Sequence, residues 1–444
     1  MANTPVTWDD QGMAFTALPH LLIGAASSAL QIEGGDRGNN WYDWAQVPGN
    51  IRDGSTPLRS TDHWVRWRED TDLLTGLGLQ IYRMSVEWSR IEPRPGEFDT
   101  VALERYREEI AALQAGGVQV LVSLHHFSQP SWFQGLGEWT IPQSVPIWLR
   151  FVREVVTALK DLVTDWVTIN EPNVYAAQSH LWQEGPPGDR SPGKVRAVMA
   201  HMAEAHCRAY LLIHELQADA RVGFAHHMRA FDPKNSRNPL HRAAVPLSSA
   251  LFQDVIAEAM LTGRFRRLLG RQPAGITPGR FHDYLGLNYY ARTASAGLSD
   301  GTFPGVPVND LGWEIYPEGL VRCIRWLRER SAAPVWITEN GTADNGDPAT
   351  GLLERFRCRF LDDHLSLLAD PTRGVERYYH WCFVDNWEWQ EGEMPRFGLV
   401  HNDYETQTRT IKPSGRFLAR IIAEGGISDA AREEFVAPQR YRIG

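Results

Sequence analysis

The sequence is poor in cysteine and in positive charge, and each shortage excludes a class of protein. Its 444 residues include four cysteines, Cys207, Cys323, Cys358 and Cys382, and no two of them are spaced as C-x-x-C. A chain of this length with so few cysteines is not a disulfide-stabilised scaffold, so we expect reduced and mostly buried thiols. The formal net charge of −9 disfavours a nucleic-acid partner, which usually requires a basic face.

Signals for export and for membrane insertion are also missing. The N-terminal segment MANTPVTWDDQGMAF contains neither the basic region nor the apolar core of a secretory signal. No apolar run approaches the ~20 residues that a membrane-spanning helix needs. We therefore expect a cytoplasmic protein with no membrane partner.

The sequence does contain a repeated alternation of short apolar runs with longer segments of helical period. Eight runs rich in Val, Ile, Tyr and Trp are predicted to be strands, most of them buried on both faces. Residues 101–117, 145–159 and 318–327 repeat apolar side chains every three or four positions, as amphipathic helices do. The predicted strands begin at Leu21, Ile81, Val118, Trp166, Arg221, Tyr284, Ala333 and Val375.

Strands that alternate with helices predict a parallel sheet, and eight such units close naturally into an α/β fold of the (β/α)₈ TIM-barrel type. A doubly wound open sheet is the alternative, but no G-x-G-x-x-G motif follows the first predicted strand. Stretches rich in Gly and Pro at residues 44–61, 231–246, 295–312 and 341–351 are predicted to be long loops, which often form or cover a site. No low-complexity linker interrupts the pattern, so we expect one domain over residues 1–444.

Polar and aromatic residues gather where the predicted strands end. In a barrel, the carboxyl ends of all strands open onto one face, which is where active sites lie. Amide, imidazole and carboxylate groups match the hydroxyls of a sugar, and indoles match the C–H face of its ring. The pattern therefore predicts a site for a neutral, polyhydroxylated ligand. The principal residues at these ends are Gln31, Glu33, Arg83, Glu87, His126, Asn170, Glu171, Asn288, Tyr290, Glu339, Trp381, Glu388 and Trp389.

Two of these carboxylates, Glu171 on the fourth predicted strand and Glu339 on the seventh, are expected on well-separated walls of the cavity. Glycoside hydrolysis needs one protonated carboxyl to assist the leaving oxygen and one carboxylate to attack the sugar or to activate water. Arg83 and Tyr290 are expected beside Glu339, where a cation and a phenolic donor favour the charged form. Glu171, with fewer charged neighbours, is predicted to be the acid.

Two pairs of adjacent histidines, His125–His126 and His226–His227, raise the question of a metal site. Adjacent residues on a strand point to opposite faces, so such a pair cannot easily share one ion. We expect one member of each pair to face the cavity and the other to be packed. No metal and no cofactor is predicted.

The order of these motifs resembles glycoside hydrolase family 1, the β-glucosidase family. The resemblance implies a (β/α)₈ barrel with Glu171 as acid/base and Glu339 as nucleophile of a retaining enzyme, and Trp313 on the leaving-group side. It also implies contacts between the non-reducing sugar and Gln31, His126, Asn170, Trp381, Glu388 and Trp389. The segments that carry it are LLIGAASSALQIEGG, YRMSVEWSRIEPRPGEFD, WVTINEPNVYA, YLGLNYY, LGWEIYPEGL, VWITENG and WCFVDNWEWQEGEMPRFGLV.

The chain departs from the family pattern at two places. Phe127 and Ser128 stand where the commonest pattern has Trp and Asp, and Glu87 stands where many members have a small residue. Neither departure involves the two carboxylates. Both therefore leave the preferred sugar and leaving group undetermined, but not the type of reaction.

The resemblance implies a small-molecule β-glycoside substrate: β-glucosides first, with β-galactosides and β-fucosides as secondary substrates. One alternative is a member tuned to another sugar or aglycone, such as a β-galactosidase or a glycolipid-type hydrolase. A 6-phospho-sugar hydrolase is disfavoured, because the Glu388 carboxylate would repel phosphate. A sugar-binding protein without catalysis is the last alternative, and the presence of both Glu171 and Glu339 argues against it.

Overall fold

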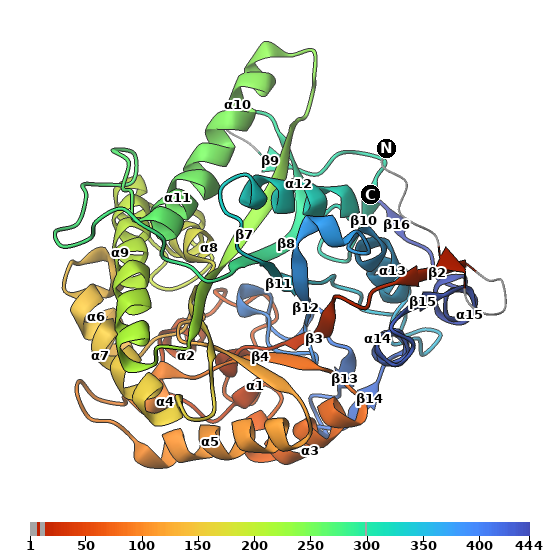
Figure 1. Ribbon diagram of the computed structural model, residues 1–444, viewed down its shortest axis with the longest axis horizontal. Coiled ribbons are helices and arrows are strands. Elements are labelled where there is room, and N and C mark those ends of the chain that lie inside the picture. Colours follow the sequence, from red (N-terminus) through yellow and green to blue (C-terminus); the bar gives the residue numbers. More distant parts are fainter. Residues whose placement is uncertain (1–6, 9–13, 298–299) are drawn as a thin grey trace.

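Eight parallel strands close into a barrel at the centre of the computed structural model, which describes residues 7–8, 14–297 and 300–444 (Figure 1). Pairing follows chain order from β3 to β8, continues to β11 and β12, and returns from β12 to β3. The predicted (β/α)₈ barrel is thus confirmed, and the open sheet is excluded. The barrel strands are β3 (Leu22–Ala26), β4 (Ile81–Ser85), β5 (Gln119–Ser123), β6 (Asp165–Asn170), β7 (Arg221–Pro233), β8 (Leu285–Ser295), β11 (Val335–Asn340) and β12 (Val375–Trp381).

Helices surround this barrel (Figure 1). The longer ones are α3 (His63–Gly76), α5 (Thr100–Ala115), α7 (Ser144–Leu159), α9 (Pro192–Leu216), α10 (Pro239–Ser249), α11 (Val255–Thr262), α12 (Pro317–Arg328), α13 (Arg357–Leu367) and α14 (Pro413–Glu424). The short helices include α1 (Ala29–Glu33), α2 (Asn40–Ala45), α4 (Trp88–Ile91), α6 (Ser131–Gly135), α8 (Pro172–Ala177) and α15 (Asp429–Ala431). Peripheral strands are β1 (Thr7–Trp8), β2 (Ala14–Ala17), β9 (Asp300–Gly301), β10 (Pro307–Val308), β13 (Val400–Asn402), β14 (Arg409–Ile411), β15 (Gly426–Ser428) and β16 (Arg442–Ile443).

Helix α5 shows how the local sequence sets an element. The Asp99 carboxylate accepts hydrogen bonds from the amides of Val101 and Ala102, which caps the first turn, and Gly116 follows the last turn. Leu103, Tyr106, Ile110 and Leu113 are buried, so the predicted helix and its apolar face are confirmed.

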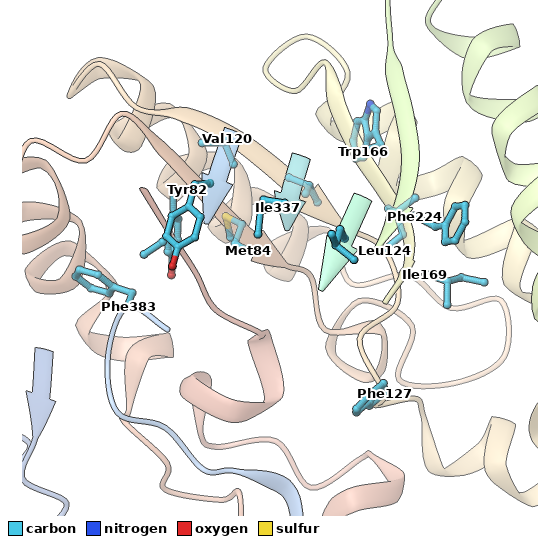
Figure 2. Packing of buried hydrophobic residues seen from close by; sticks show 14 of the residues in the cluster. Tyr82, Met84, Val120, Leu124, Phe127, Trp166, Ile169, Phe224, Ile337 and Phe383 are labelled. Atoms are coloured by element: carbon cyan, nitrogen blue, oxygen red, sulfur yellow. The ribbon is translucent and has the colours of Figure 1, made fainter. Parts of the chain in front are cut away.

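Strand β4 shows how the barrel divides its side chains between two environments. Tyr82 and Met84 point outward into the main hydrophobic cluster between barrel and helices (Figure 2). Ile81 belongs to a second cluster inside the barrel, and Arg83 also faces inward, toward Glu339. Because both faces are covered, every residue of β4 is buried, as predicted for a parallel barrel strand.

The prediction of a loop at residues 231–246 is wrong. Strand β7 continues to Pro233, and α10 already begins at Pro239. The Asn238 side chain accepts a hydrogen bond from the Leu240 amide, and Pro239 stands in the first turn, where no intrahelical N–H is needed. Pro246 lies inside α10 without ending it.

Helix α10 continues through a π-helical turn, η3 (Ala250–Asp254), into α11, so that Pro239–Thr262 forms one helical stretch of 24 residues. By length and composition alone this stretch is apolar enough to cross a membrane, which corrects the expectation that no such run exists. The helix packs against β7 and α9, as helices of barrel proteins do.

The four cysteines are free and buried, as predicted. The N-terminal segment, for which no secretory signal is predicted, lies largely outside the described residues.

Candidate active site

A cavity of about 310 Å³ lies at the carboxyl ends of the barrel strands. Three other predicted residues, Gln31, Arg83 and Asn288, are fully buried and lie behind its wall. The predicted residues that line it are His126, Asn170, Glu171, Tyr290, Trp313, Glu339, Trp381, Glu388 and Trp389.

Glu339, near the end of β11, is held by hydrogen bonds to both of its carboxylate oxygens. Nη1 of Arg83 donates to Oε1 at 2.5 Å, and the Tyr290 hydroxyl donates to Oε2 at 2.6 Å. The Arg83 guanidinium also donates to Asn170 Oδ1 at 2.7 Å and to Ser123 Oγ at 3.0 Å, so its plane is fixed. The predicted placement of Arg83 and Tyr290 beside Glu339 is confirmed.

Glu171 follows β6 directly and occupies the residue before α8, with a left-handed φ of 44°. Both described hydrogen bonds to its carboxyl group reach Oε1: Asn288 Nδ2 lies 2.7 Å away and His227 Nδ1 lies 3.0 Å away. The second oxygen, Oε2, has no hydrogen bond within the described part of the chain. It is therefore the oxygen that can carry a proton toward a ligand.

Three of the eight described non-glycine residues with a left-handed φ line this cavity. Phe127, Glu171 and Trp389 all line it, and all adopt left-handed φ values, of 68°, 44° and 51°. Non-glycine residues adopt this conformation at a cost that the surrounding structure must offset, and such residues cluster at functional sites.

The two carboxyl groups influence the ionisation of each other. Burial raises the pKa of Glu339 to about 7, against the charge of Arg83, and the charge of Glu171 adds to the rise. Burial also acts to raise the pKa of Glu171, but its interactions with His227 and the hydrogen bond from Asn288 outweigh burial and lower the pKa. Taken together, these interactions favour the proton on Glu339.

The surroundings of Glu171 include one contact that the sequence analysis did not predict. Glu171 was predicted to have few charged neighbours and therefore to hold the proton. His227 lies on β7, far from Glu171 in the chain, and is the neighbour that this prediction missed.

A second group of residues at the cavity combines an amide, a carboxyl group and several aromatic rings. Gln31 Nε2 donates to Glu388 Oε2 at 3.1 Å, so Gln31 reaches the cavity through Glu388. The His126 ring is stacked against Trp381, with centroids 5.6 Å apart, and against Trp389, at 6.0 Å. Asn170 donates to His126 Nε2 at 3.1 Å. Burial and the charge of Arg83 hold the pKa of His126 well below its usual range, so the ring is neutral.

Glu388 is less acidic than an exposed glutamate. Burial and the charge of Glu339 raise its pKa to about 8, although hydrogen bonds from Trp381 and Gln31 oppose the rise. Because this pKa lies near neutrality, the Glu388 carboxyl group can donate as well as accept a hydrogen bond.

Comparison with known proteins identifies the chain. The model of the family described as Glycosyl hydrolase family 1 matches residues 15–278 and 281–427. The chain belongs to glycoside hydrolase family 1. It is a β-glucosidase-like hydrolase, because it matches β-glucosidases along almost their whole length.

Three relatives illustrate the similarity. Beta-glucosidase A of Thermotoga maritima is 28% identical over 439 residues, which cover 92% of this chain and 98% of the relative. A β-glucosidase of an Agrobacterium species is 30% identical over 436 residues, covering 90% and 94%. The solved structure of the Thermotoga maritima family 1 β-glucosidase superposes with a TM-score of 0.85 at 26% identity, covering 93% of this chain and all of that one.

Two of the residues that the sequence did not single out for the family 1 site are His227 and Arg229, both on β7. Arg229 Nε donates to His227 Nε2 at 3.2 Å, which leaves Nδ1 to carry the imidazole proton toward Glu171. His226 instead contacts the Gln253 carbonyl at 3.1 Å. One histidine of this pair faces the cavity and the other is packed, as predicted. The contact of His227 with Glu171 could not be predicted from the strand pattern.

Glu87 lies outside the cavity lining. It is the carboxylate that would be considered next if Glu171 were not the acid. Its side chain accepts hydrogen bonds from Ser128 Oγ at 2.6 Å and from Ser89 Oγ at 2.7 Å. The two departures from the family pattern, at Glu87 and at Ser128, are therefore in direct contact. Burial and the charge of Asp36 raise the pKa of Glu87 to about 7, although the serine donors oppose the rise.

Replacing His227 with alanine is expected to move the alkaline limb of the kcat/KM profile to higher pH by about one unit. The ring donates to Glu171 and favours its charged form, so its loss raises the pKa and the acid form persists at higher pH. A hydrogen bond to a charged group of about 1.5 kcal/mol corresponds to about one pKa unit. The other groups that face Glu171 are Asn288, Arg83 and Glu339.

The pH dependence of kcat/KM for a nitrophenyl glucoside measures this shift. His226→Ala is the matched control, because His226 contacts the Gln253 carbonyl rather than Glu171. An unchanged alkaline limb in His227→Ala, with activity retained, would contradict the role of His227.

Proposed function

We propose that this family 1 enzyme is a retaining β-glycosidase that hydrolyses terminal, non-reducing β-D-glucosyl residues, with β-D-fucosides and β-D-galactosides as further substrates. The observation that carries the proposal is the pair Glu171 and Glu339 in one cavity, with both oxygens of Glu339 held by Arg83 and Tyr290. Similarity to β-glucosidases, one of them solved in complex with glucoimidazole, supports glucose as the preferred sugar.

In the first step, a Glu339 oxygen attacks the anomeric carbon as the glycosidic C–O bond breaks. Arg83 and Tyr290 hold this carboxylate in position. Glu171 gives its proton to the departing oxygen. With a substrate bound, the single proton of the carboxyl pair must therefore be on Glu171, and Oε2, which is free of hydrogen bonds to the described residues, is the oxygen that delivers it.

In the second step, the Glu171 carboxylate removes a proton from water. The water oxygen forms a bond to the anomeric carbon, and the bond to Glu339 breaks. Donation from Asn288 and His227 to Oε1 stabilises Glu171 as an anion at this stage. The neighbours of Glu339 thus support its role as nucleophile, and those of Glu171 support its role as base in this second step.

Two inversions predict that the product first formed from a β-glucoside is β-glucose. Proton NMR during the first minutes of hydrolysis measures the anomer before mutarotation mixes the two forms. The spontaneous mutarotation of added β-glucose under the same conditions is the control. An initial excess of α-glucose would indicate a single displacement by water and would contradict the covalent route through Glu339.

A further inference from the structure

Beside the catalytic cavity lies a second cavity of about 520 Å³, whose lining is mainly hydrocarbon. It is formed between η2 (Gln178–Trp182), α9 and the α10–η3–α11 helix, next to the extended end of β7. We call it the apolar pocket. Among its lining residues are Leu181, Trp182, Leu247, Leu251, Phe252 and Leu268.

Large apolar side chains in this pocket are unusually exposed. Leu247 is 59% exposed, Leu251 is 52% exposed and Leu268 is 58% exposed, although all three contribute to a concave surface. Leu181 and Trp182 are each 38% exposed. A contiguous apolar patch of this kind marks a binding surface, because a protein gains stability by covering it.

The apolar pocket adjoins the catalytic cavity. Trp182 and Arg229 line both of them. The His227 ring, which contacts Glu171, also packs edge-on against Phe252 with centroids 5.9 Å apart, and Phe252 is stacked on Trp182 at 6.2 Å. One aromatic ring therefore separates the acid/base from the start of the pocket.

Arg229 marks the boundary between the polar and the apolar space. Its guanidinium lies over Phe252 at 5.0 Å and near Trp182 at 5.7 Å from the ring centroids, and its Nε donates to His227. It forms no ion pair with a carboxylate of the described residues. Beyond Arg229 most of the lining is hydrocarbon, and its polar side chains are Arg196, Ser248 and Asp300, so this space suits a hydrocarbon better than a second sugar.

We propose that the apolar pocket binds the apolar part of the leaving group, so that the preferred substrates are β-glycosides of an alkyl or polycyclic alcohol rather than oligosaccharides. The proposal rests on the proposed hydrolysis of β-glucosides. It follows from position, because the pocket begins beside Glu171, the group that protonates the leaving oxygen, and from the hydrocarbon lining that continues from there.

A series of β-glucosides of straight-chain primary alcohols, from propyl to nonyl and below their critical micelle concentrations, tests the proposal. These alcohols are similar leaving groups, so differences in kcat/KM report binding of the chain. Burial of one methylene is worth at most about a fourfold gain. We expect kcat/KM to rise about two- to fourfold per methylene until the pocket is filled, and a flat series would overturn the proposal.

Leu251→Asn should flatten this dependence on chain length, so that its loss of kcat/KM relative to the unsubstituted enzyme grows from propyl to nonyl glucoside. Leu240→Asn is the matched control, since Leu240 is 74% exposed on the same helix but does not line the pocket. If Leu240→Asn flattens the series as much as Leu251→Asn does, the effect belongs to the helix surface and the proposal is overturned.

Two further measurements separate other occupants of the patch. The first is the oligomeric state in solution. If the protein is a dimer, and Leu251→Asn converts it to a monomer without changing the alkyl series, a second copy of the chain covers the leucines. The protein could also sediment with phosphatidylcholine vesicles. If Leu251→Asn abolishes this sedimentation and leaves the alkyl series unchanged, the patch binds a membrane. Either result overturns the proposal.

Failure of the proposed function would look different. If no glucoside in the series is hydrolysed, β-glucoside hydrolysis is wrong, and calorimetric titration with octyl β-thioglucoside still tests the pocket. Binding that weakens at least about tenfold in Leu251→Asn but not in Leu240→Asn supports an apolar ligand in the pocket, and equal binding to both variants overturns it.

Discussion

Replacement of Glu339 with alanine is expected to lower kcat for β-glucosides by at least about 10⁴-fold, the order of loss seen when a nucleophile is removed from a covalent mechanism. The side chain that forms the bond to the anomeric carbon is gone, while the walls that hold the sugar remain. Arg83 and Tyr290, which donate to Glu339, would then face a vacant space large enough for a small anion.

Azide or formate should restore part of the turnover of an activated glucoside by Glu339→Ala. With azide, the product should be the α-glucosyl azide, because a single displacement inverts the anomeric carbon. Product analysis by NMR decides the matter, and the rescue itself shows that the variant is folded. Near-native activity in Glu339→Ala would mean that another residue is the nucleophile.

The second large effect is expected for Glu171→Ala, and it should depend on the leaving group. A disaccharide or alkyl glucoside needs a proton on the departing oxygen, so its hydrolysis should fall by about 10²- to 10⁴-fold, the usual contribution of general acid catalysis. A dinitrophenolate leaves without that proton, so its glycosylation step should be spared and the intermediate on Glu339 should accumulate.

Azide should accelerate turnover of dinitrophenyl glucosides by Glu171→Ala and give the β-glucosyl azide, because an anion needs no base to attack the intermediate. The alkaline limb of the pH profile should also flatten, since it reports ionisation of the acid. Equal loss with every leaving group, and no response to azide, would exclude Glu171. Glu87 would not be its replacement, because it lies outside the cavity.

Position along the barrel could be predicted from the sequence, whereas contacts across the barrel could be predicted only in part. Glu171 and Glu339 could be assigned to one face because parallel strands open their carboxyl ends to the same side. Arg83 could be placed beside Glu339 because a cation there favours the nucleophile. The contact between His227 and Glu171 depends on the orientation of one ring, which the alternation of a strand leaves undetermined.

The apolar pocket escaped prediction for a different reason. Its outer wall is α10, which lies where Gly, Pro and polar residues predicted a loop. Pro239 in the first helical turn is favourable, so a proline there does not indicate a loop. Pro246 removes one intrahelical hydrogen bond, but packing against β7 keeps the helix continuous. Tertiary contacts outweighed local propensity here.

The contact between Glu87 and Ser128 makes these two positions interdependent in any exchange of segments with other family members. The commonest family pattern has an acidic residue at position 128, and many members have a small residue at 87, so each arrangement keeps one acidic group in the same buried space. If only the segment around Ser128 is replaced by that of such a relative, two acidic groups lie close together. If only the segment around Glu87 is replaced, the Ser128 hydroxyl loses its acceptor. A chimaera should therefore keep its fold only when both segments come from the same parent.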